Sequence, residues 1–567
     1  MLQRYGKQSV RQNFPPIKYK GPEFAVFGVP GLRNWCLFLI LLRFLTFFVY
    51  FCNLKSLTMS VERNSQDNKN AGNNGAENGY VRTTGSFTER LKAVKRGRWI
   101  RFSVVSLLFF GWVVWLQNPW VLIAYPLLID IYLTHYIPFT AWRGWKNNVA
   151  RTIMGWVDAI VYALICCYFL FAFVGQQYQI PSSSLEKSLL VGDFLWVNKI
   201  TYGPRVPNTP LHFPLAQNTL PILNCKSYID KPQFEYHRLK GLRGVERNDI
   251  VVFNFPAGDT VTEKVQNPDY YTLVAQYGRE TVWNNPQQFG KVFYRPVDRR
   301  ENYVKRCLGL PGERLKIVDN IVYINGEPLR EPTNVQYNYI IQTSGGMLGD
   351  SEWETLGVNV DDRHLECDGR QYLNNSAQIL VLRSLGLNVG ENGETAPIYI
   401  APLTAAAVAE ARKMPAIAHV VMVPEGEMFP VYPISKDYGW TRSNYGEIWI
   451  PKKGESIALT TDNLPIYERP IRNYEGNDLR VADGVIYING KPATSYTFKM
   501  DYYWMMGDNR DRSADSRYWD FVPEDHIVGS PVLIIISMDK DRKLTNGKMR
   551  WNRMFRNPNP DKKGGKW

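Results

Sequence analysis

Residues 180–199 read IPSSSLEKSLLVGDFLWVNK, and the chain changes character on either side of them. The preceding residues, 153–174, form an apolar stretch that reaches the ~20 residues needed for a helix across a membrane. The residues that follow contain short runs rich in Val, Ile and Tyr, separated by Gly, Pro and Asn-Gly turns. Examples of these runs are 249–255, 314–324, 447–450 and 532–536. The sequence therefore predicts N-terminal transmembrane α-helices followed by a mainly-β domain that begins near Gln176.

Three further apolar stretches lie earlier in the chain, at 35–52, 102–116 and 120–133. The last two are separated by only three residues, one of which is a proline. Residues 102–134 are therefore expected to form a tight transmembrane helical hairpin.

The charges of the loops predict the orientation of these helices. Basic residues gather at 90–101 and at 143–151, and the positive-inside rule places both groups in the cytoplasm. Everything after Gly175 is then extracytoplasmic. Asp130 and Asp158 lie within apolar stretches. They are interpreted either as a functional intramembrane pair or as residues that lie near helix ends or face a neighbouring helix.

The positive charge of the chain is concentrated at its beginning. The formal net charge is +14, and residues 1–101 hold seventeen Lys and Arg against five Asp and Glu. A basic groove for nucleic acid through the folded part is therefore not expected. Seven Cys in 567 residues are too few to organise a fold through disulfides. The sequence leaves open whether Cys225 and Cys367 pair.

An internal repeat relates GERLKIVDNIVYINGEP at 312–328 to GNDLRVADGVIYINGKP at 476–492. Each copy is predicted to form two strands around an Asp-containing turn, closed by an Asn-Gly turn. The copies are either a duplication or two independent hairpins with the same turn chemistry. In both cases residues 330–475 are interpreted as a large insertion between two hairpins that border one sheet.

Three segments are unlike ordinary β-domain sequence. The first is the run Ser182, Ser183 and Ser184 after Pro181, close to the end of an apolar helix. A serine hydroxyl is a weak nucleophile unless a base activates it. The alternative interpretation is a serine-rich linker that leaves a membrane helix.

The second segment, YVKRCLGLPGE at 303–313, supplies a candidate base. Period-two alternation places Lys305 on the same strand face as Tyr303 and Cys307. A lysine on a buried face loses hydration, its pKa falls, and it can act as a general base near neutral pH. The alternative is a lysine on an edge strand that faces water.

The third segment, WMMGDNRDRSADSRYW at 504–519, alternates acidic and basic residues at high density. This pattern predicts a loop braced by internal ion pairs and by hydrogen bonds from side chains to the backbone. The alternative is a solvated polar turn.

Together with RNDIVVFNFP at 247–256, these segments follow a membrane helix in an order that closely resembles bacterial type I signal peptidases, in particular their Bacteroidota-like branch. The resemblance covers 176–325 and 483–536 well. It implies a signal-peptidase-type β fold and a Ser/Lys dyad. Ser184 would be the nucleophile and Lys305 the general base.

The resemblance also assigns supporting roles. The Ser182 hydroxyl would help to form the oxyanion hole, Ser513 would orient the Lys305 amine, and Asp515 with Arg517 would form a structural ion pair. The positions that would line the substrate pockets are Tyr178, Ile180, Pro181, Leu185, Leu189, Leu195, Tyr303 and Val304.

Four sites depart from the family pattern. Leu185 replaces the usual Met and Ser183 a common Gly. Arg512 stands where the family usually has Asn, and Lys187-Ser188 where it often has Pro-Thr. The change at Leu185 is a mild apolar one, and the changes at Arg512 and at Lys187-Ser188 fall on no catalytic role.

The implied function is removal of signal peptides from exported preproteins after small residues of the Ala-x-Ala type, through an acyl-enzyme. No cofactor and no metal are expected. The expected partners are signal peptides, the lipid bilayer and the secretion translocon, with no nucleic acid. The expected location is the inner (plasma) membrane, in several passes, with the catalytic domain on the periplasmic side.

The expected domains follow from these interpretations. They are a basic cytoplasmic region at 1–101, a transmembrane hairpin at 102–134, a basic cytoplasmic loop at 135–152, a transmembrane helix at 153–175, a catalytic β domain at 176–329 and 476–540, an insertion or cap at 330–475, and a basic C-terminal tail at 541–567.

Other hydrolase classes find less support. Ser184 and Lys187 spell the S-x-x-K signature of penicillin-binding proteins, but the K-T-G sequence of that class is absent. Neither G-x-S-x-G nor H-E-x-x-H occurs. The apolar segment 35–52 contains Arg43 and has basic residues on both sides, which disfavours a simple span. We therefore expect the functional chain to begin at Met59.

Overall fold

The computed structural model describes residues 87–559 and Asp561, apart from short gaps. The gaps are 93, 117–118, 135, 138, 140, 221–222, 224, 370–372, 374, 426–429, 435–437, 543–544 and 546. The predictions for 35–52 and for a start at Met59 lie outside the described residues. The chain divides into two compact units. One contains Val174–Pro204 and Gly241–Trp567, and the described part of the other is 87–173 with Arg205–Lys240.

The second unit is mainly helical. Its helices are α2 (Phe87–Lys92), α3 (Arg96–Leu116), α4 (Tyr125–Ile129) and α5 (Asn148–Phe169), with short 3-10 or π turns η1 (Pro119–Ala124), η2 (Asp130–Thr134), η3 (Ala141–Gly144) and η4 (Leu170–Val174). Two helices, Arg96–Leu116 and Asn148–Val174, are long and apolar enough to cross a membrane, and Val121–Thr134 is a shorter apolar helix. The Asn147 side chain caps α5 by accepting hydrogen bonds from the backbone of Val149 and Ala150.

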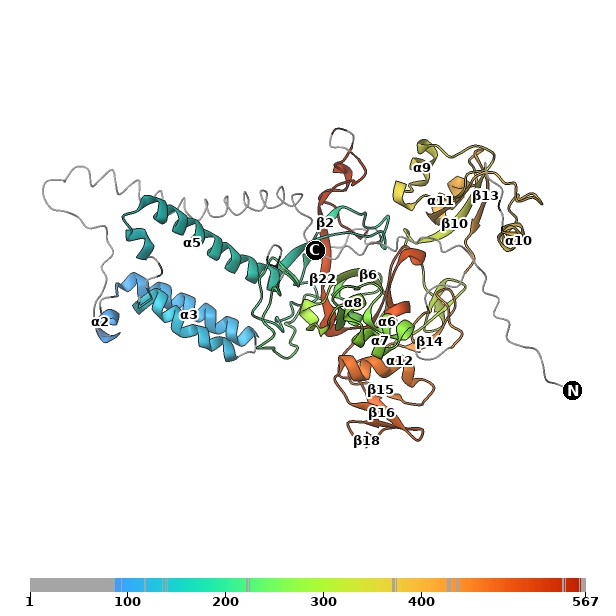
Figure 1. Ribbon diagram of the computed structural model, residues 1–567. Helices are drawn as coiled ribbons and strands as arrows, with labels where there is room; N and C mark the ends of the chain where they lie inside the picture. Colours follow the sequence, from blue (N-terminus) through green and yellow to red (C-terminus); the bar gives the residue numbers. More distant parts are fainter. Residues whose placement is uncertain are drawn as a thin grey trace. The chain divides into compact units, whose positions relative to one another are not determined.

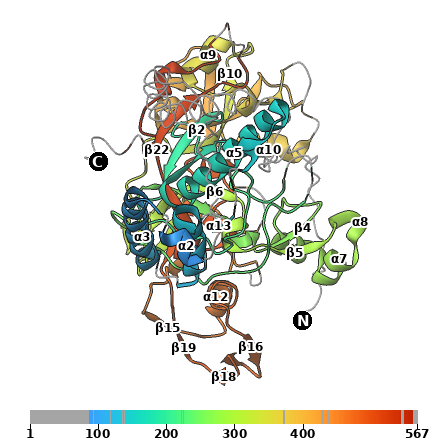
Figure 2. The ribbon, with the colours of Figure 1, turned by 90° about the vertical axis from the view of Figure 1, so that its left-hand side faces the viewer.

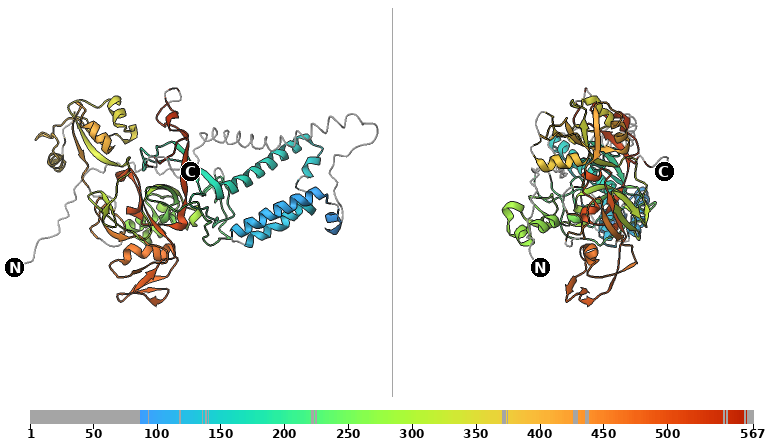
Figure 3. Two further views of the ribbon diagram at one scale, coloured as in Figure 1. Left: turned by 180° about the vertical axis from the view of Figure 1, so that it is seen from behind. Right: turned by 90° about the vertical axis from the view of Figure 1, so that its right-hand side faces the viewer.

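Helix α3 lies beside the α4–η2 segment, as Figure 3 shows. The Tyr125 ring packs against Phe109 and Phe110, with ring centroids 5.7 and 4.8 Å away. The two aspartates of the apolar stretches make different contacts. Asp130 accepts a hydrogen bond from the Thr134 hydroxyl at 2.7 Å, whereas the exposed Asp158 lies 3.8 Å from Arg143.

Residues 205–240 pack onto this unit without regular strands. Val206 and Leu239 form a small core with Leu116, and Phe173 packs against it. The Tyr168 hydroxyl donates to the Pro210 carbonyl at 2.9 Å. Cys225 is exposed and its thiol is free, so no disulfide joins it to Cys367.

The first unit is built on an antiparallel sheet of seven strands in the order β1-β2-β22-β3-β6-β20-β21. The strands are β1 (Gly175–Gln179), β2 (Asp193–Asn198), β3 (Ile250–Asn254), β6 (Asn302–Gly309), β20 (Tyr502–Met506), β21 (Val522–Pro523) and β22 (Ile527–Ser537). All five residues of β3 are buried, as expected for a central strand. The long strand β22 lies beside β2 (Figure 1).

Both copies of the sequence repeat form the predicted hairpins. The first contains β7 (Arg314–Val318), β8 (Ile321–Ile324) and β9 (Glu327–Pro328), and the second β16 (Leu479–Ala482), β17 (Val485–Ile488) and β18 (Lys491–Pro492). Their turns have positive φ at Asp319-Asn320 and at Asp483-Gly484. The expectation that they border one sheet is wrong. The first hairpin pairs with β14 (Tyr445–Trp449) and so belongs to a four-stranded sheet. Among the described residues, the second hairpin pairs with no other strand, and β16, β17 and β18 form a separate three-stranded sheet.

Residues within 330–475 include a four-stranded sheet in the order β11-β12-β10-β13. Its strands are β10 (Gln336–Thr343), β11 (His364–Cys367), β12 (Ile398–Thr404) and β13 (Ile417–Met422), and its helices are α9 (Asp350–Leu356), α10 (Ser376–Ser384) and α11 (Ala405–Ala411). Helices α9 and α11 lie against this sheet (Figure 1), and Trp353, Leu403 and Ala411 are buried between them. Helix α11 is formed by the alanine-rich run AAAVAEA.

One helical excursion was not expected from the β-rich sequence of 176–329. Between β4 (Thr260–Thr262) and β5 (Val292–Tyr294), the chain forms α6 (Tyr270–Tyr277), α7 (Arg279–Asn284) and α8 (Pro286–Phe289). Leu273, Val282 and Phe289 form its core. The Asp269 side chain caps α6 by accepting from the backbone of Tyr271 and Thr272.

The remaining elements complete the first unit. They are β15 (Ser456–Ala458), β19 (Ser495–Thr497), α12 (Leu464–Arg469) and α13 (Ser516–Trp519), with short helical turns at Pro256–Gly258, Val297–Arg299, Val360–Asp362, Pro470–Tyr474, Arg510–Arg512, Glu524–His526 and Trp551–Arg553. Figure 2 shows α12 beside the small β15–β19 and β16–β18 sheets, and all share one hydrophobic core.

Beyond β22 the chain turns back on itself. The Phe555 amide donates to the Ile534 carbonyl at 2.7 Å, and the Ile534 amide donates to the Arg556 carbonyl at 3.0 Å. We call residues 550–559 and 561 the C-terminal segment.

Candidate active site

Ser184 and Lys305 meet beside β6, an inner strand of the seven-stranded sheet. Lys305 lies on β6, opposite Val251 of β3. Ser184 lies in an irregular turn between β1 and β2, which we call the serine turn (residues 181–192). The Lys305 Nζ and Ser184 Oγ atoms are 2.8 Å apart, and the two residues are only 5% and 6% exposed. This distance permits proton transfer between amine and hydroxyl.

The surroundings of Lys305 favour its neutral form. Burial lowers the pKa of Lys305 from 10.5 to about 8, although the nearby carboxylates of Asp515 and Asp508 raise it. The amine also lies 5.7 Å from the centroid of the Tyr303 ring. A much larger fraction of Lys305 than of an ordinary lysine is therefore uncharged near neutral pH and able to accept a proton.

The serine turn is held by the segment that follows β20, which we call the GDN loop (residues 507–517). The Asn509 amide donates to the Ser184 carbonyl at 3.1 Å, and Asn509 Nδ2 donates to the Ser183 carbonyl at 3.3 Å. Gly507 allows this close approach, because a Cβ there would overlap both the Ser184 carbonyl oxygen and Ser513 Oγ.

A buried ion pair stiffens the GDN loop. Arg517 Nε and Nη2 donate to the two carboxylate oxygens of Asp515 at 2.8 and 2.9 Å, and both side chains are fully buried. Burial alone would raise the pKa of Asp515, but the Arg517 guanidinium holds it below its ordinary value. The same carboxylate accepts from the Gly507 amide at 3.1 Å.

Ser513 is buried in this loop, beside Gly507. Its hydroxyl lies near enough to the Asp515 carboxylate to favour the ionised form, but it makes no hydrogen bond of normal geometry among the described residues. Ser513 is thus near the dyad, but it does not touch Lys305 through a hydrogen bond in this structure.

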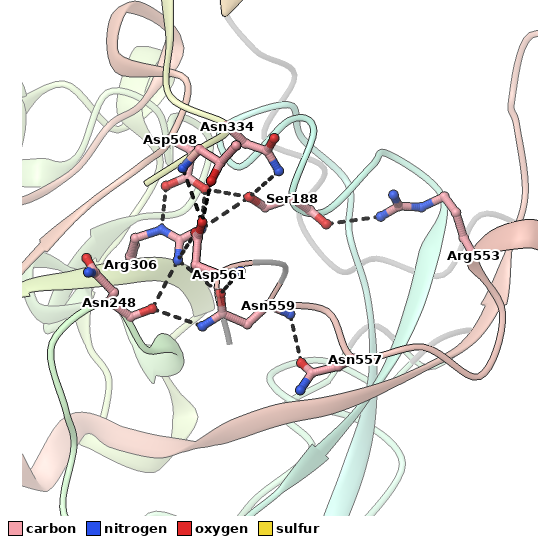
Figure 4. A network of polar contacts seen from close by, with 10 residues as sticks. Ser188, Asn248, Arg306, Asn334, Asp508, Arg553, Asn557, Asn559 and Asp561 are labelled. Atoms are coloured by element: carbon pink, nitrogen blue, oxygen red, sulfur yellow. Dashed lines mark hydrogen bonds and ion pairs between the residues drawn. The ribbon is translucent and has the colours of Figure 1, made fainter. Parts of the chain in front are cut away.

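A second buried cluster joins β6 to the serine turn (Figure 4). Arg306 Nε and Nη2 donate to the two oxygens of Asp508, each at 2.7 Å. The Ser188 hydroxyl donates to Asp508 at 2.7 Å and accepts from Arg306 at 3.2 Å. The Asp508 carboxylate therefore connects Arg306, the neighbour of Lys305, to Ser188 of the serine turn.

The C-terminal segment completes this cluster. Arg306 Nη1 lies 3.2 Å from Asp561 and donates to Asn559 Oδ1 at 3.2 Å. Arg553 Nη2 donates to the Ser188 carbonyl at 3.0 Å and to the buried Asp193 carboxylate at 2.7 Å. The contacts of Arg553, Asn559 and Asp561 are visible in Figure 4. The sequence at 541–567 predicted a basic tail and did not predict these contacts.

A cavity of about 400 Å³ opens beside the dyad. Its lining includes Ser182, Ser184 and Lys305, together with the expected pocket residues Pro181, Tyr303 and Val304. The other expected pocket residues lie elsewhere. Ile180, Leu185, Leu189 and Leu195 are buried in a core behind the serine turn, and Tyr178 packs against that core.

The opposite wall of the cavity comes from residues that sequence reasoning missed. They are Phe255, Ala257–Gly258, Thr260–Tyr270 without Pro268, Glu301 and Asn302. Two features of the sequence could have indicated this part of the lining. They are the long connection between residues 256 and 301, and Asp269 within it, which caps a helix. Among the described residues, no cluster of three or more His, Cys, Asp or Glu is arranged to hold a metal ion.

Comparison with known proteins matches the chain to one family, described as Signal peptidase, peptidase S26. The match covers residues 153–432 and 453–536, which is more than half of the chain. It includes Ser184, Lys305, the GDN loop and the whole four-stranded sheet at 336–422.

Individual relatives agree with this match. The chain is 22% identical over 369 residues to Signal peptidase I of Buchnera aphidicola subsp. Schizaphis graminum, covering 65% of this chain and 70% of the relative. It is 21% identical over 439 residues to Signal peptidase I of Buchnera aphidicola subsp. Baizongia pistaciae, covering 77% and 92%. Signal peptidase I of Helicobacter pylori is 30% identical over 138 residues, which are 22% of this chain and 48% of that relative.

Proposed function

Because this chain belongs to the signal peptidase family, peptidase S26, we propose that it removes signal peptides from exported preproteins through a Ser184/Lys305 dyad. The observation that carries the proposal is the 2.8 Å contact between Lys305 Nζ and Ser184 Oγ at the edge of a cavity. A buried lysine with a lowered pKa supplies the base that a serine nucleophile needs.

The reaction is an acyl transfer in two stages. Neutral Lys305 takes the Ser184 proton, and Ser184 Oγ attacks the carbonyl carbon of the scissile peptide. The Ser182 hydroxyl and the Ser184 amide stabilise the oxyanion. The leaving amine of the substrate takes the proton from Lys305. The Lys305 amine, neutral again, then accepts a proton from a water molecule, which hydrolyses the acyl-enzyme.

The supporting residues act on the base. The buried Ser513 hydroxyl lies near the Asp515 carboxylate but makes no hydrogen bond of normal geometry among the described residues, so it is available to hold the Lys305 amine during the reaction. The Asp515–Arg517 ion pair fixes the loop that carries Ser513.

The substrate is a preprotein with small residues before the cut, of the Ala-x-Ala type. Pro181, Tyr303 and Val304 line the cavity together with the dyad, and we assign the binding of these small residues to this part of its lining. The wall formed by Phe255 and by residues near Thr260–Thr262 extends the binding surface away from the dyad.

The membrane arrangement follows from the helices. Arg96–Leu116 and Asn148–Val174 span the inner membrane, and the apolar helix Val121–Thr134 returns the chain to the cytoplasm. The catalytic unit is then periplasmic, where the translocon delivers its substrates. The residues at 330–475 form an insertion in the catalytic domain.

The test is cleavage of one purified preprotein in detergent or vesicles, followed by mass analysis of both products. Ser184→Ala and Lys305→Ala should each abolish cleavage while circular dichroism stays unchanged. Lys305→Arg should fail as well, because a guanidinium stays protonated. Ser513→Ala should lower kcat far more than it raises KM. Substantial cleavage by Lys305→Ala would refute the dyad.

A further inference from the structure

Three of the residues that depart from the family pattern around the dyad contact the 330–475 insertion. Lys187 Nζ donates to the Gly357 carbonyl, and Arg512 forms an ion pair with Asp362. The Ser188 hydroxyl accepts from Asn334 Nδ2 at 3.3 Å. These contacts give a physical reason for three substitutions that the dyad chemistry alone does not explain.

Further contacts join the same surfaces. The buried Glu186 carboxylate accepts from Asn359 Nδ2 at 2.8 Å. On the other side of the dyad, the Gln336 amide donates to the Asp508 carbonyl at 2.8 Å, and the Asn338 amide donates to Asp511 at 2.7 Å. The insertion therefore holds both the serine turn and the GDN loop.

The part of the insertion that makes half of these contacts is anchored in the core of the insertion. Residues 357–362, which we call the docking loop, follow directly after α9. Gly357 ends that helix in the left-handed conformation (φ +67°), which directs the chain toward Lys187. Trp353 and Leu356, just before the loop, and Val358 within it are buried in the core of the insertion.

The serine turn needs such external support. It contains no regular strand or helix, and Lys187 itself has a positive φ of 73°. A residue other than glycine adopts that conformation at a cost of about 1 kcal/mol or more, and persists there when its surroundings hold it. The charges also balance across the contact, with Glu186 and Asp362 facing Lys187 and Arg512.

We propose that the insertion is a positioning element of the active site, in which Asn359 and Asp362 of the docking loop hold the serine turn against the GDN loop so that Ser184 stays within reach of Lys305. The inference rests on the proposed peptidase function. It predicts that the insertion contributes to kcat without binding the scissile peptide.

The experiment exchanges charges across the contact in the full-length protein. Asp362→Arg should lower kcat for preprotein cleavage on the order of 10- to 100-fold with KM nearly unchanged, because small misplacements of reacting atoms cost this much. The double variant Asp362→Arg with Arg512→Asp restores the ion pair and should recover most of kcat. Asn359→Ala is a milder variant with a smaller loss in the same direction.

The matched control is Asp350→Ala. It removes an ion pair with Arg363 at 2.9 Å that lies wholly inside the insertion, one residue from Asp362. It should leave kcat unchanged. Wild-type kcat in both Asp362→Arg and Asn359→Ala, or failure of the charge exchange to recover activity, would overturn the proposal.

A second readout does not depend on catalysis. In the Ser184→Ala background, Asp362→Arg should speed amide hydrogen exchange at residues 182–189, whereas Asp350→Ala should not. Unchanged exchange there would refute docking. If instead wild type fails to cleave preproteins while exchange responds as expected, the proposed function fails and the positioning contact stands.

Discussion

The two members of the dyad are held in opposite ways. Lys305 lies on β6, a strand paired on both sides within the seven-stranded sheet, so its position follows from strand register. Ser184 lies in a turn held by the GDN loop, the docking loop and the C-terminal segment. Lys305, the proposed base, is positioned by regular pairing with two neighbouring strands. Ser184, the proposed nucleophile, is positioned by contacts to its turn from segments 173 to 365 positions away.

Substitutions at the two residues of the proposed dyad and around them should therefore have two different kinds of effect. A change at Lys305 alters the chemistry but leaves a sheet that forms without it. A change in the segments that contact the serine turn leaves the chemistry intact but misplaces the nucleophile.

The largest effect is expected at the base itself. Lys305→Met should lower cleavage at least about 10⁴-fold and at the same time stabilise the fold by roughly 1–3 kcal/mol at neutral pH. The reason is that the folded protein holds the pKa of Lys305 at about 8, below its ordinary 10.5. Folding therefore opposes the charged form at lower pH, and this cost disappears as the pH rises from about 8 to about 10.5. Denaturant unfolding of both proteins across this range provides the measurement.

Lys316 offers a control for that experiment. It is a strand lysine on β7 that is partly exposed, with its amine 5.4 Å from the Tyr323 ring centroid. Lys316→Met should change neither activity nor the pH dependence of unfolding by a comparable amount. Equal stabilisation by both variants would mean that Lys305 carries no special cost of burial.

A smaller effect is expected where distant segments converge. Asp508→Asn leaves the Arg306 guanidinium buried with a weaker partner, which should destabilise the protein by about 3 kcal/mol and lower kcat as the Ser188 contact weakens. The exposed Arg314–Glu447 pair is the matched comparison, at 2.9 Å with side chains 63% and 47% exposed. Glu447→Gln should cost less than about 1 kcal/mol. Chemical unfolding distinguishes the two, and equal losses would contradict the importance of the buried cluster.

The smallest expected effect is a dependence on pH. Burial raises the pKa of Glu186 from 4.5 to about 7, with the nearby Asp362 carboxylate adding to the shift and the Asn359 hydrogen bond and Lys187 opposing it. Because the folded pKa lies above the ordinary value, the associated stability is present below about pH 4.5 and is lost as the pH rises through about 7.

Glu186→Gln imitates the protonated group and should remove this slope. Its unfolding free energy should exceed that of wild type by roughly 1–2 kcal/mol near pH 8 and by little near pH 5. The exposed Glu410, paired with Lys413 on the insertion, serves as control through Glu410→Gln. A parallel pH dependence in wild type and Glu186→Gln would exclude Glu186 as the titrating group.

Sequence reasoning reached the features that have local signatures. The alternation around Lys305 indicated a buried strand face, and the Asp-Asn and Asp-Gly turns indicated two hairpins, as the structure has them. Apolar stretches indicated the helices Arg96–Leu116 and Asn148–Val174.

Features built from distant contacts had no such signature. Leu185 and Leu189 are apolar whether they line a pocket or fill a core, and the structure places them in a core. The docking loop begins at Gly357, which ends α9. The sequence near Gly357 does not indicate that its carbonyl accepts a hydrogen bond from Lys187, because the two residues are far apart in the chain. Helix α6, by contrast, was within reach of sequence reasoning, because Asp269 followed by a helical run is a local signal.

The C-terminal segment has a consequence in time. Arg553 binds the Ser188 carbonyl across 365 positions of sequence, and Asn559 binds Arg306 across 253. During synthesis, Ser184 and Lys305 emerge long before these residues exist. Contacts of such separation form late and slowly because a long loop must close first. The newly made chain therefore passes through a period in which Ser184 and Lys305 are present without these contacts, and full activity of the proposed dyad should arrive only after residues 553–561 have been added and have docked.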